Sequence, residues 1–143
     1  MNLINLQAGG IRDWKNNDKV SFNNQNLDDH HVFPKKYLQQ KYPQLDDIRV
    51  DCVLNRALVP KITNIKMGGN PPSRYLKELL LGNPDLGKSL ESHLIPPDLI
   101  DGVYDDSYEL FLKNRAKKVI DVVNTQILPL KAELERDMFG TDV

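Results

Sequence analysis

Cysteine is almost absent from the sequence, since Cys52 is the only one among 143 residues. The chain can therefore form neither an intrachain disulfide nor a zinc site built from several cysteines, which favours a reducing, cytoplasmic location. No apolar run approaches the length of about 18 residues that a membrane-spanning helix needs. Residues 1–6 lack the basic region and apolar stretch of a secretory signal. We expect a cytoplasmic domain that has no membrane segment.

A strong excess of either charge is also missing, because the net charge is −1. The charge is unevenly distributed, however: residues 31–78 carry nine basic and four acidic side chains, whereas residues 79–143 carry seven basic and twelve acidic ones. A local basic segment is what the phosphate backbone of DNA requires, whatever the global charge. The segment is compatible with DNA binding, and equally with an unevenly charged, solvated surface.

The length predicts one domain with a single core. Apolar residues make up 40% of the chain and charged residues 27%, which is ordinary for a globular domain. We expect an α+β fold in which short strands and a small helix hold the site and α-helices pack around them. The scattered apolar residues at the beginning look like the end of an element that continues upstream. We therefore expect the chain to be the C-terminal part of a larger protein.

Turn residues, prolines and apolar spacing predict where the secondary-structure elements begin and end. The expected strands are 19–22, 27–33 and 48–54, and the expected helices are 35–42, 61–67, 74–81, 84–93 and 107–127. In the longest helix we expect an apolar stripe against the core, formed by Leu112, Ala116, Val119, Ile120, Val123 and Ile127. Pro129 should interrupt this helix, and residues 130–139 should add a last turn or two.

Two of the three histidines, His30 and His31, are adjacent at the end of a strand-like run that Pro34 closes. Phosphodiester hydrolysis needs an activated water and a cation on the developing charge, and histidine is a suitable general base at neutral pH. Strict alternation along a strand would place the two rings on opposite faces. Both can reach one phosphate only if the strand ends or twists there. His93, on an amphipathic helix, is expected to be structural.

Three segments resemble the HNH nuclease superfamily, whose fold is the ββα-metal fold. These segments are residues 30–34, 51–59 and 63–76. More narrowly, they are similar to the C-terminal nuclease domain of GmrSD-type restriction proteins, in which an N-terminal ParB-like, nucleotide-hydrolysing domain comes first. The resemblance implies a single domain over residues 1–143, with a nuclease core at about 19–76 and a helical extension at about 77–139. It also implies DNA as the partner and a role in restriction or defence.

The resemblance implies a role for each matched residue. His31 would be the general base that activates water, and His30 and Asn64 would be metal ligands. Asn55 would be the middle asparagine that orients the site, and its amide can bond backbone groups across the loop. Asp28, two residues before His30 in the strand, can support that histidine as a hydrogen-bond partner.

Three basic residues are predicted to contact nucleic-acid phosphates. They are Lys35, Lys66 and Arg74, and they follow from charge and position rather than from the family pattern.

One departure from the superfamily concerns the metal. Members that bind zinc tightly have a further histidine one helical turn after the third position, where this chain has Gly68. With His30 and Asn64 as the only protein ligands, the ion would keep several waters, which suits Mg²⁺ best. The nitrogen ligand leaves Mn²⁺, Ni²⁺ or Zn²⁺ as possible alternatives.

Two further interpretations stay open at this point. The chain can be a non-catalytic nucleic-acid-binding module on the same scaffold, which would bind DNA with a steep salt dependence and never cut it. It can also be a helical interaction domain with an incidental pair of histidines. In that case His30 and Asn64 should lie far apart.

Overall fold

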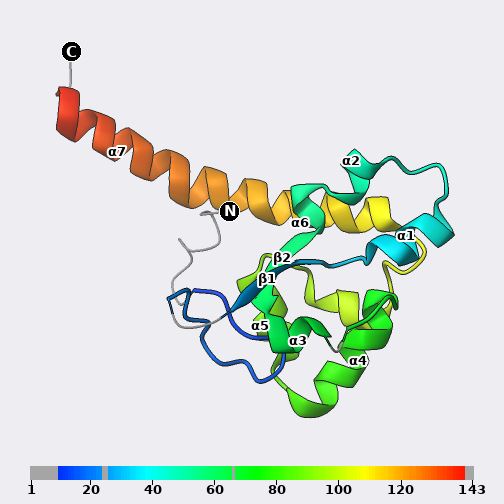
Figure 1. Cartoon of the computed structure of the whole chain (residues 1–143). Coiled ribbons are helices and arrows are strands. Elements are labelled where there is room, and N and C mark those ends of the chain that lie inside the picture. The colour runs from blue at the N-terminus through cyan, green and yellow to red at the C-terminus, as the bar shows by residue number, and fades with distance from the viewer. Residues whose placement is uncertain (1–9, 24–25, 66, 141–143) are drawn as a thin grey trace.

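The computed structural model describes residues 10–23, 26–65 and 67–140, and the fold is α+β (Figure 1). A two-stranded antiparallel sheet lies near the centre of the molecule, with helices on both sides of it. The strands are β1 (Leu27–His31) and β2 (Arg56–Pro60). The helices are α1 (Lys35–Lys41), α2 (Asp47–Val50), α3 (Lys61–Ile65), α4 (Pro72–Gly82), α5 (Leu86–Ser92), α6 (Tyr108–Val122) and α7 (Leu128–Phe139). Two 3-10 turns, η2 (Val53–Asn55) and η3 (Pro97–Asp101), and a π turn, η4 (Val123–Ile127), complete the order.

The hairpin pairs β1 with β2 in a register that sets His30 opposite Ala57 and His31 opposite Arg56. β1 agrees with the predicted strand over 27–33, but the predicted strand over 48–54 is wrong. That segment forms α2 and η2 instead, and the strand follows it. Helix α2 begins after Asp46 because the Asp46 side chain accepts a hydrogen bond from the Arg49 amide, which is a typical N-cap contact.

Two smaller predictions also differ from the structure. In the expected strand over 19–22, only Lys19 pairs, in an isolated bridge with Arg12. The helix expected over 61–67 ends earlier, at Ile65, before Gly68 with its positive φ of 58°. The helices predicted at 35–42, 74–81 and 84–93 are confirmed to within two or three residues at each end.

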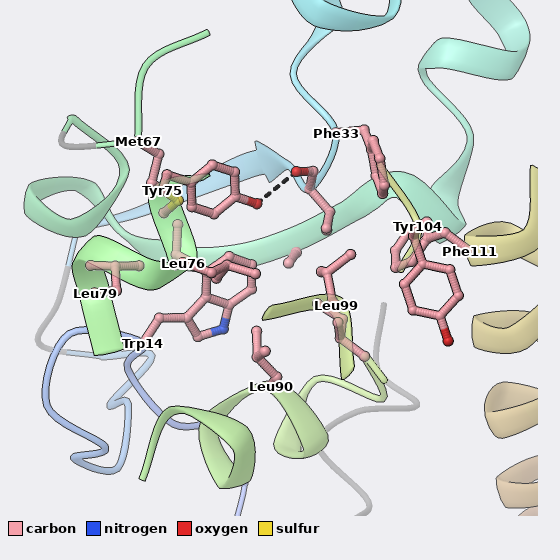
Figure 2. Close-up of a cluster of buried hydrophobic side chains, with 14 of the residues drawn as sticks. Trp14, Phe33, Met67, Tyr75, Leu76, Leu79, Leu90, Leu99, Tyr104 and Phe111 are labelled. Carbon is pink, nitrogen blue, oxygen red and sulfur yellow. Dashed lines mark hydrogen bonds between the residues drawn. The ribbon is translucent and has the colours of Figure 1, made fainter. Parts of the chain in front are cut away.

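One hydrophobic cluster runs from the first described loop to α6. Trp14 is fully buried and lies among Leu76, Leu79 and Leu90 in Figure 2, while Phe33 and Phe111 close the other end of the cluster. The predicted nuclease core and the predicted helical extension therefore share one core. The Tyr75 hydroxyl, from α4, donates a hydrogen bond to the Val32 carbonyl at 2.6 Å, which ties this core to the residue that follows His31.

The long C-terminal helix differs from its prediction in two ways. Pro129 does not interrupt it, because the π turn η4 precedes α7 and removes the clash that a proline ring makes in a regular helix. The buried residues of α6 are Tyr108, Phe111, Arg115 and Val122. Of the predicted stripe, Leu112, Val119 and Ile127 pack partly buried against the core clusters, whereas Ile120 is exposed. Figure 1 shows α7 projecting away from the rest of the molecule, and all of its residues are exposed.

Among the described residues, none of the helices combines the length and apolar character that crossing a membrane requires.

Candidate active site

The end of β1 brings both adjacent histidines to one pocket. The strand stops at His31, and the pocket has a volume of about 330 Å³. Its walls are formed by Asp29, His30, His31, Pro34, Lys35, Asn64, Ile65 and Gly68. Three of the residues expected at the site, His30, His31 and Asn64, therefore line the same cavity. This geometry does not fit an incidental histidine pair with Asn64 far away.

His30 faces the interior. Its exposed fraction is 6%, and its ring makes T-shaped contacts with Trp14 and Tyr75, each at a centroid distance of 5.8 Å. Burial lowers the pKa of His30 to about 4, although the neighbouring Asn64 side chain partly opposes this effect. The ring is therefore neutral near pH 7. Its buried Nε2 has no hydrogen-bond partner among the described residues.

Asn64, on α3, is half-buried and oriented by β1. Its Nδ2 donates to Asp28 Oδ2 at 3.0 Å, so the oxygen of the amide is left for another partner. This differs from the sequence prediction, in which Asp28 supports His30. No hydrogen bond between Asp28 and His30 is present in the described part of the chain. Asp28 thus positions the asparagine rather than the histidine of the candidate ligand pair.

His31 lies on the opposite face of β1, and its side chain is 24% exposed. Its Nε2 is 2.7 Å from Asp51 Oδ1 and 2.8 Å from Arg56 Nη1. The guanidinium of Arg56 also bonds Asp29 Oδ2 at 2.6 Å, which raises the Arg56 pKa. The hydrogen bond with His31 lowers the pKa of Asp51 below its usual value. His31 is thus the centre of a charged network on the outer face.

Sequence reasoning missed the two partners of His31, Asp51 and Arg56, and also Asp29, which bonds Arg56. Arg56 is opposite His31 in the strand register, so a correct prediction of β2 would have found it. Asp51 is the residue at the C-terminal end of α2, and the predicted strand over 48–54 concealed this position. Asp46 is the sequence signal that could have located both Asp51 and Arg56, because an N-cap residue there indicates a helix in place of the predicted strand.

Asn55 is fully buried and fastens the loop before β2 to the end of β1. Its Oδ1 accepts from the Phe33 amide at 2.8 Å, and its Nδ2 donates to the carbonyls of Phe33 and Val50 at 3.1 and 2.9 Å. The backbone carbonyl of Asn55 accepts from the Val32 amide. The amide therefore bonds backbone groups across the loop, as the sequence suggests. Asn55 does not line the pocket, so it holds the frame that carries His31.

A buried arginine supports the same frame from α6. Arg115 is 2% exposed and donates to the carbonyls of Leu54, Arg56 and His93. Burial lowers its pKa to about 10. The imidazole Nε2 of His93 bonds the Arg12 carbonyl at 2.9 Å, which fits the expected structural role.

The predicted phosphate-binding residues lie in different settings. Lys35 lines the pocket, but its ammonium is 3.0 Å from Asp47, and this contact raises its pKa. Arg74 is exposed on α4 and is not a wall of the pocket, and Lys66 lies outside the described residues. Of the eight basic residues between 31 and 78 that the structure describes, four form ion pairs, namely Lys35, Lys41, Arg49 and Arg56. Carboxylates therefore neutralise much of the basic segment.

The pocket offers few protein ligands for a metal ion. Within residues 10–23, 26–65 and 67–140, no three His, Cys, Asp or Glu side chains converge as a metal-binding group. His30 is nevertheless a suitable ligand, because a neutral imidazole with a buried, unpartnered nitrogen is ready to coordinate. Asp28 binds the Nδ2 of Asn64, and the Asn64 side chain is also a neighbour of His30. These two residues fit a hydrated divalent ion better than a closed site with four protein ligands.

Comparisons with known proteins add little to this geometry. No protein family and no solved structure matched the chain. A segment of 54 residues, or 38% of the chain, is 39% identical to the uncharacterized protein MJ0686 of Methanocaldococcus jannaschii. That segment spans 9% of the archaeal protein, so the similarity covers a small part of a much longer relative.

Proposed function

We propose that the chain is a metal-dependent DNA endonuclease domain of the HNH type. The observation that carries the proposal is the shared pocket: His30 and His31 come from β1, and Asn64 comes from α3, yet all three line one cavity. The order of β1, β2 and α3 supports the ββα-metal core that the resemblance implies. Asn55 holds the end of β1 through hydrogen bonds to Phe33. This supports the orienting role that the resemblance implies for the middle asparagine.

In the proposed phosphodiester hydrolysis, His31 and the pair of His30 and Asn64 have different roles. His31, partly exposed, takes a proton from the attacking water as general base. His30 and Asn64 would hold a divalent ion, for which Mg²⁺ is the first choice and Mn²⁺, Ni²⁺ or Zn²⁺ the alternatives. The bound ion would neutralise charge on the scissile phosphate. Lys35, at the pocket wall, contacts a neighbouring phosphate after it leaves Asp47.

The proposed setting is cytoplasmic restriction or defence against foreign or modified DNA. It rests on the resemblance of residues 30–34, 51–59 and 63–76 to the nuclease domain of GmrSD-type restriction proteins. A ParB-like NTPase domain elsewhere in the full-length protein would then supply recognition or energy coupling.

A plasmid-nicking assay across Mg²⁺, Mn²⁺, Ni²⁺, Zn²⁺ and EDTA tests the proposal. We expect nicking with a divalent ion, and a loss of about 10²-fold to 10⁴-fold in rate for His31→Ala, which is the usual contribution of a general base. Gln40→Ala, an exposed change on α1 away from the pocket, is the matched control and should nick normally. Equal rates for wild type and a folded His31→Ala variant would overturn the assignment.

Metal binding can be tested without catalysis. Mn²⁺ should raise the thermal midpoint of the wild type, since a ligand that binds only the folded state stabilises it. Asn64→Ala should remove this shift, whereas Gln40→Ala should retain it. DNA binding that weakens steeply with salt, without nicking in any metal, would support the non-catalytic binding module instead.

A further inference from the structure

We propose that Asp51 is a positioning residue that fixes His31 in the tautomer with the proton on Nε2, and that Arg56 competes for the same ring nitrogen. The hydrogen-bonding part of this inference concerns the free protein. Its consequence for catalysis rests on the proposed nuclease function.

Two groups approach Nε2 of His31, and this nitrogen cannot form a hydrogen bond with both of them at once. Asp51 Oδ1 lies 2.7 Å from this nitrogen, and Arg56 Nη1 lies 2.8 Å from it. A carboxylate only accepts hydrogen bonds and a guanidinium only donates them. A neutral imidazole carries one N–H and one lone pair, so Nε2 either donates to Asp51 or accepts from Arg56. Each partner therefore selects the opposite tautomer.

The surrounding contacts favour Asp51. Arg56 has other acceptors, because its Nη2 is 2.6 Å from Asp29 Oδ2 and its Nη1 is 3.3 Å from Asp51 Oδ1. The guanidinium thus stays well bonded when Nε2 carries a proton. Asp51 is ionised at neutral pH, since its pKa lies below the usual value, and hydrogen bonds to a charged acceptor are the stronger kind.

The position of the ring gives this tautomer a chemical meaning. His31 lines the pocket, whereas Asp51 does not, so Nε2 is directed at a group outside the cavity. With the proton on Nε2, the lone pair is on Nδ1 and can accept a proton from water. With Arg56 as the partner, the proton would be on Nδ1, and the base would be blocked. A wrong tautomer of this kind is costly to a general-base histidine.

The first test reads the tautomer directly. Long-range ¹H–¹⁵N NMR spectra of the ¹⁵N-labelled full chain, recorded in EDTA at pH 8, show which nitrogen of each histidine is protonated. We expect the proton on Nε2 of His31 in the wild type and on Nδ1 in Asp51→Ala. Asp51→Glu, which keeps an acceptor, should restore the wild-type pattern. A proton on Nδ1 in the wild type, or no change in Asp51→Ala, would overturn the inference.

Asp29→Ala is a closely matched control. Asp29 and Asp51 have side chains that are 48% and 49% exposed, and both bond Arg56, but only Asp51 touches His31. If the carboxylates act merely by holding Arg56, the two variants should behave alike. We expect Asp29→Ala to leave the His31 tautomer unchanged.

The second test concerns the proposed reaction. In the nicking assay, we expect Asp51→Ala to lower kcat at least 10²-fold with KM for DNA nearly unchanged, which corresponds to loss of general-base assistance. Gln40→Ala, an exposed change on α1 away from the pocket, should retain kcat. Full activity of Asp51→Ala in an active wild-type background would contradict the catalytic consequence. An inactive wild type with the expected NMR pattern would contradict the nuclease proposal and leave the tautomer assignment supported.

Discussion

The inner and outer faces of β1 give two adjacent histidines opposite environments. His30 packs against Trp14 and Tyr75 and forms no ion pair with any described residue, whereas His31 contacts a carboxylate and a guanidinium. The difference arises from the alternation of side chains along a strand, combined with a core on one side only. A single dipeptide thereby places one neutral imidazole in the interior and one hydrogen-bonded imidazole on the outer face. The following predictions test this contrast between the faces.

The largest expected effect is a loss of stability in mild acid. The pKa values of His30 and His93 are about 4 in the folded chain, below the ordinary 6.5, so the unfolded chain binds more protons as the pH falls between these values. The free energy of unfolding should fall over this interval, on the order of 3 kcal/mol for each histidine, and the histidine contribution should level off below about pH 4.

Urea titrations between pH 7.5 and 4.5 in EDTA would measure this loss. His93→Gln should remove about half of the pH dependence, because a glutamine does not titrate in this range. A wild-type stability that is flat over the interval would show that the inner face does not hold its histidine neutral.

The next largest effect is expected for Asn55, which joins the loop before β2 to the strand end. Asn55→Ala removes three hydrogen bonds and leaves buried groups of Phe33 and Val50 unpaired. We expect a loss of about 3 kcal/mol in the free energy of unfolding. Asn114→Ala, which removes a single hydrogen bond to Tyr104, is a control that should cost about 1 kcal/mol or less.

Truncation of each histidine compares the two faces directly. His30→Ala should cost about 2 kcal/mol, because it opens a cavity beside Trp14, while His31→Ala should cost under about 0.5 kcal/mol. Chemical denaturation of both variants at pH 7.5 would measure the difference. Similar costs for the two substitutions would break the proposed contrast.

The smallest effect is expected on the outer face. Asp29→Asn removes the ion pair between Asp29 and Arg56, whose side chains are 48% and 23% exposed, respectively. The free energy of unfolding should fall by about 0.5 kcal/mol at low salt. Sodium chloride at 1 M should reduce this cost, since exposed charges are screened. The cost of His30→Ala should not depend on salt.

The sequence predicted that His30, His31 and Asn64 come together, but it predicted the elements around them less well. The histidine run and the two asparagines have fixed spacing in the sequence, and their side chains are restricted to a few kinds of hydrogen-bonding and ligand chemistry. The segment 48–54 was misassigned because its apolar alternation resembles a strand, yet Ile48 and Val53 are exposed and Asp46 caps a helix. Local capping outweighed alternation there. Without the position of β2, the partners Asp51 and Arg56 could not be assigned to His31.

Pro129 shows a second kind of limit. A proline ordinarily ends or kinks a helix, and sequence rules predict that outcome. Here the preceding π turn accommodates the ring, and a π turn is rare enough that composition alone does not indicate it.

The π turn also sets the phase of the helix beyond it. It adds one residue to a turn, so Leu130 follows Val122 by the equivalent of seven regular steps, or about two full turns. Leu130, Leu134 and Met138 therefore continue the side of the helix on which Phe111 and Val122 are buried, although they are exposed themselves. Deleting one residue between 123 and 127 would convert the π turn into a regular one, which keeps this side in phase but returns the proline clash. In this helix, the extra residue before Pro129 makes room for the proline ring and leaves the apolar side continuous from α6 to α7.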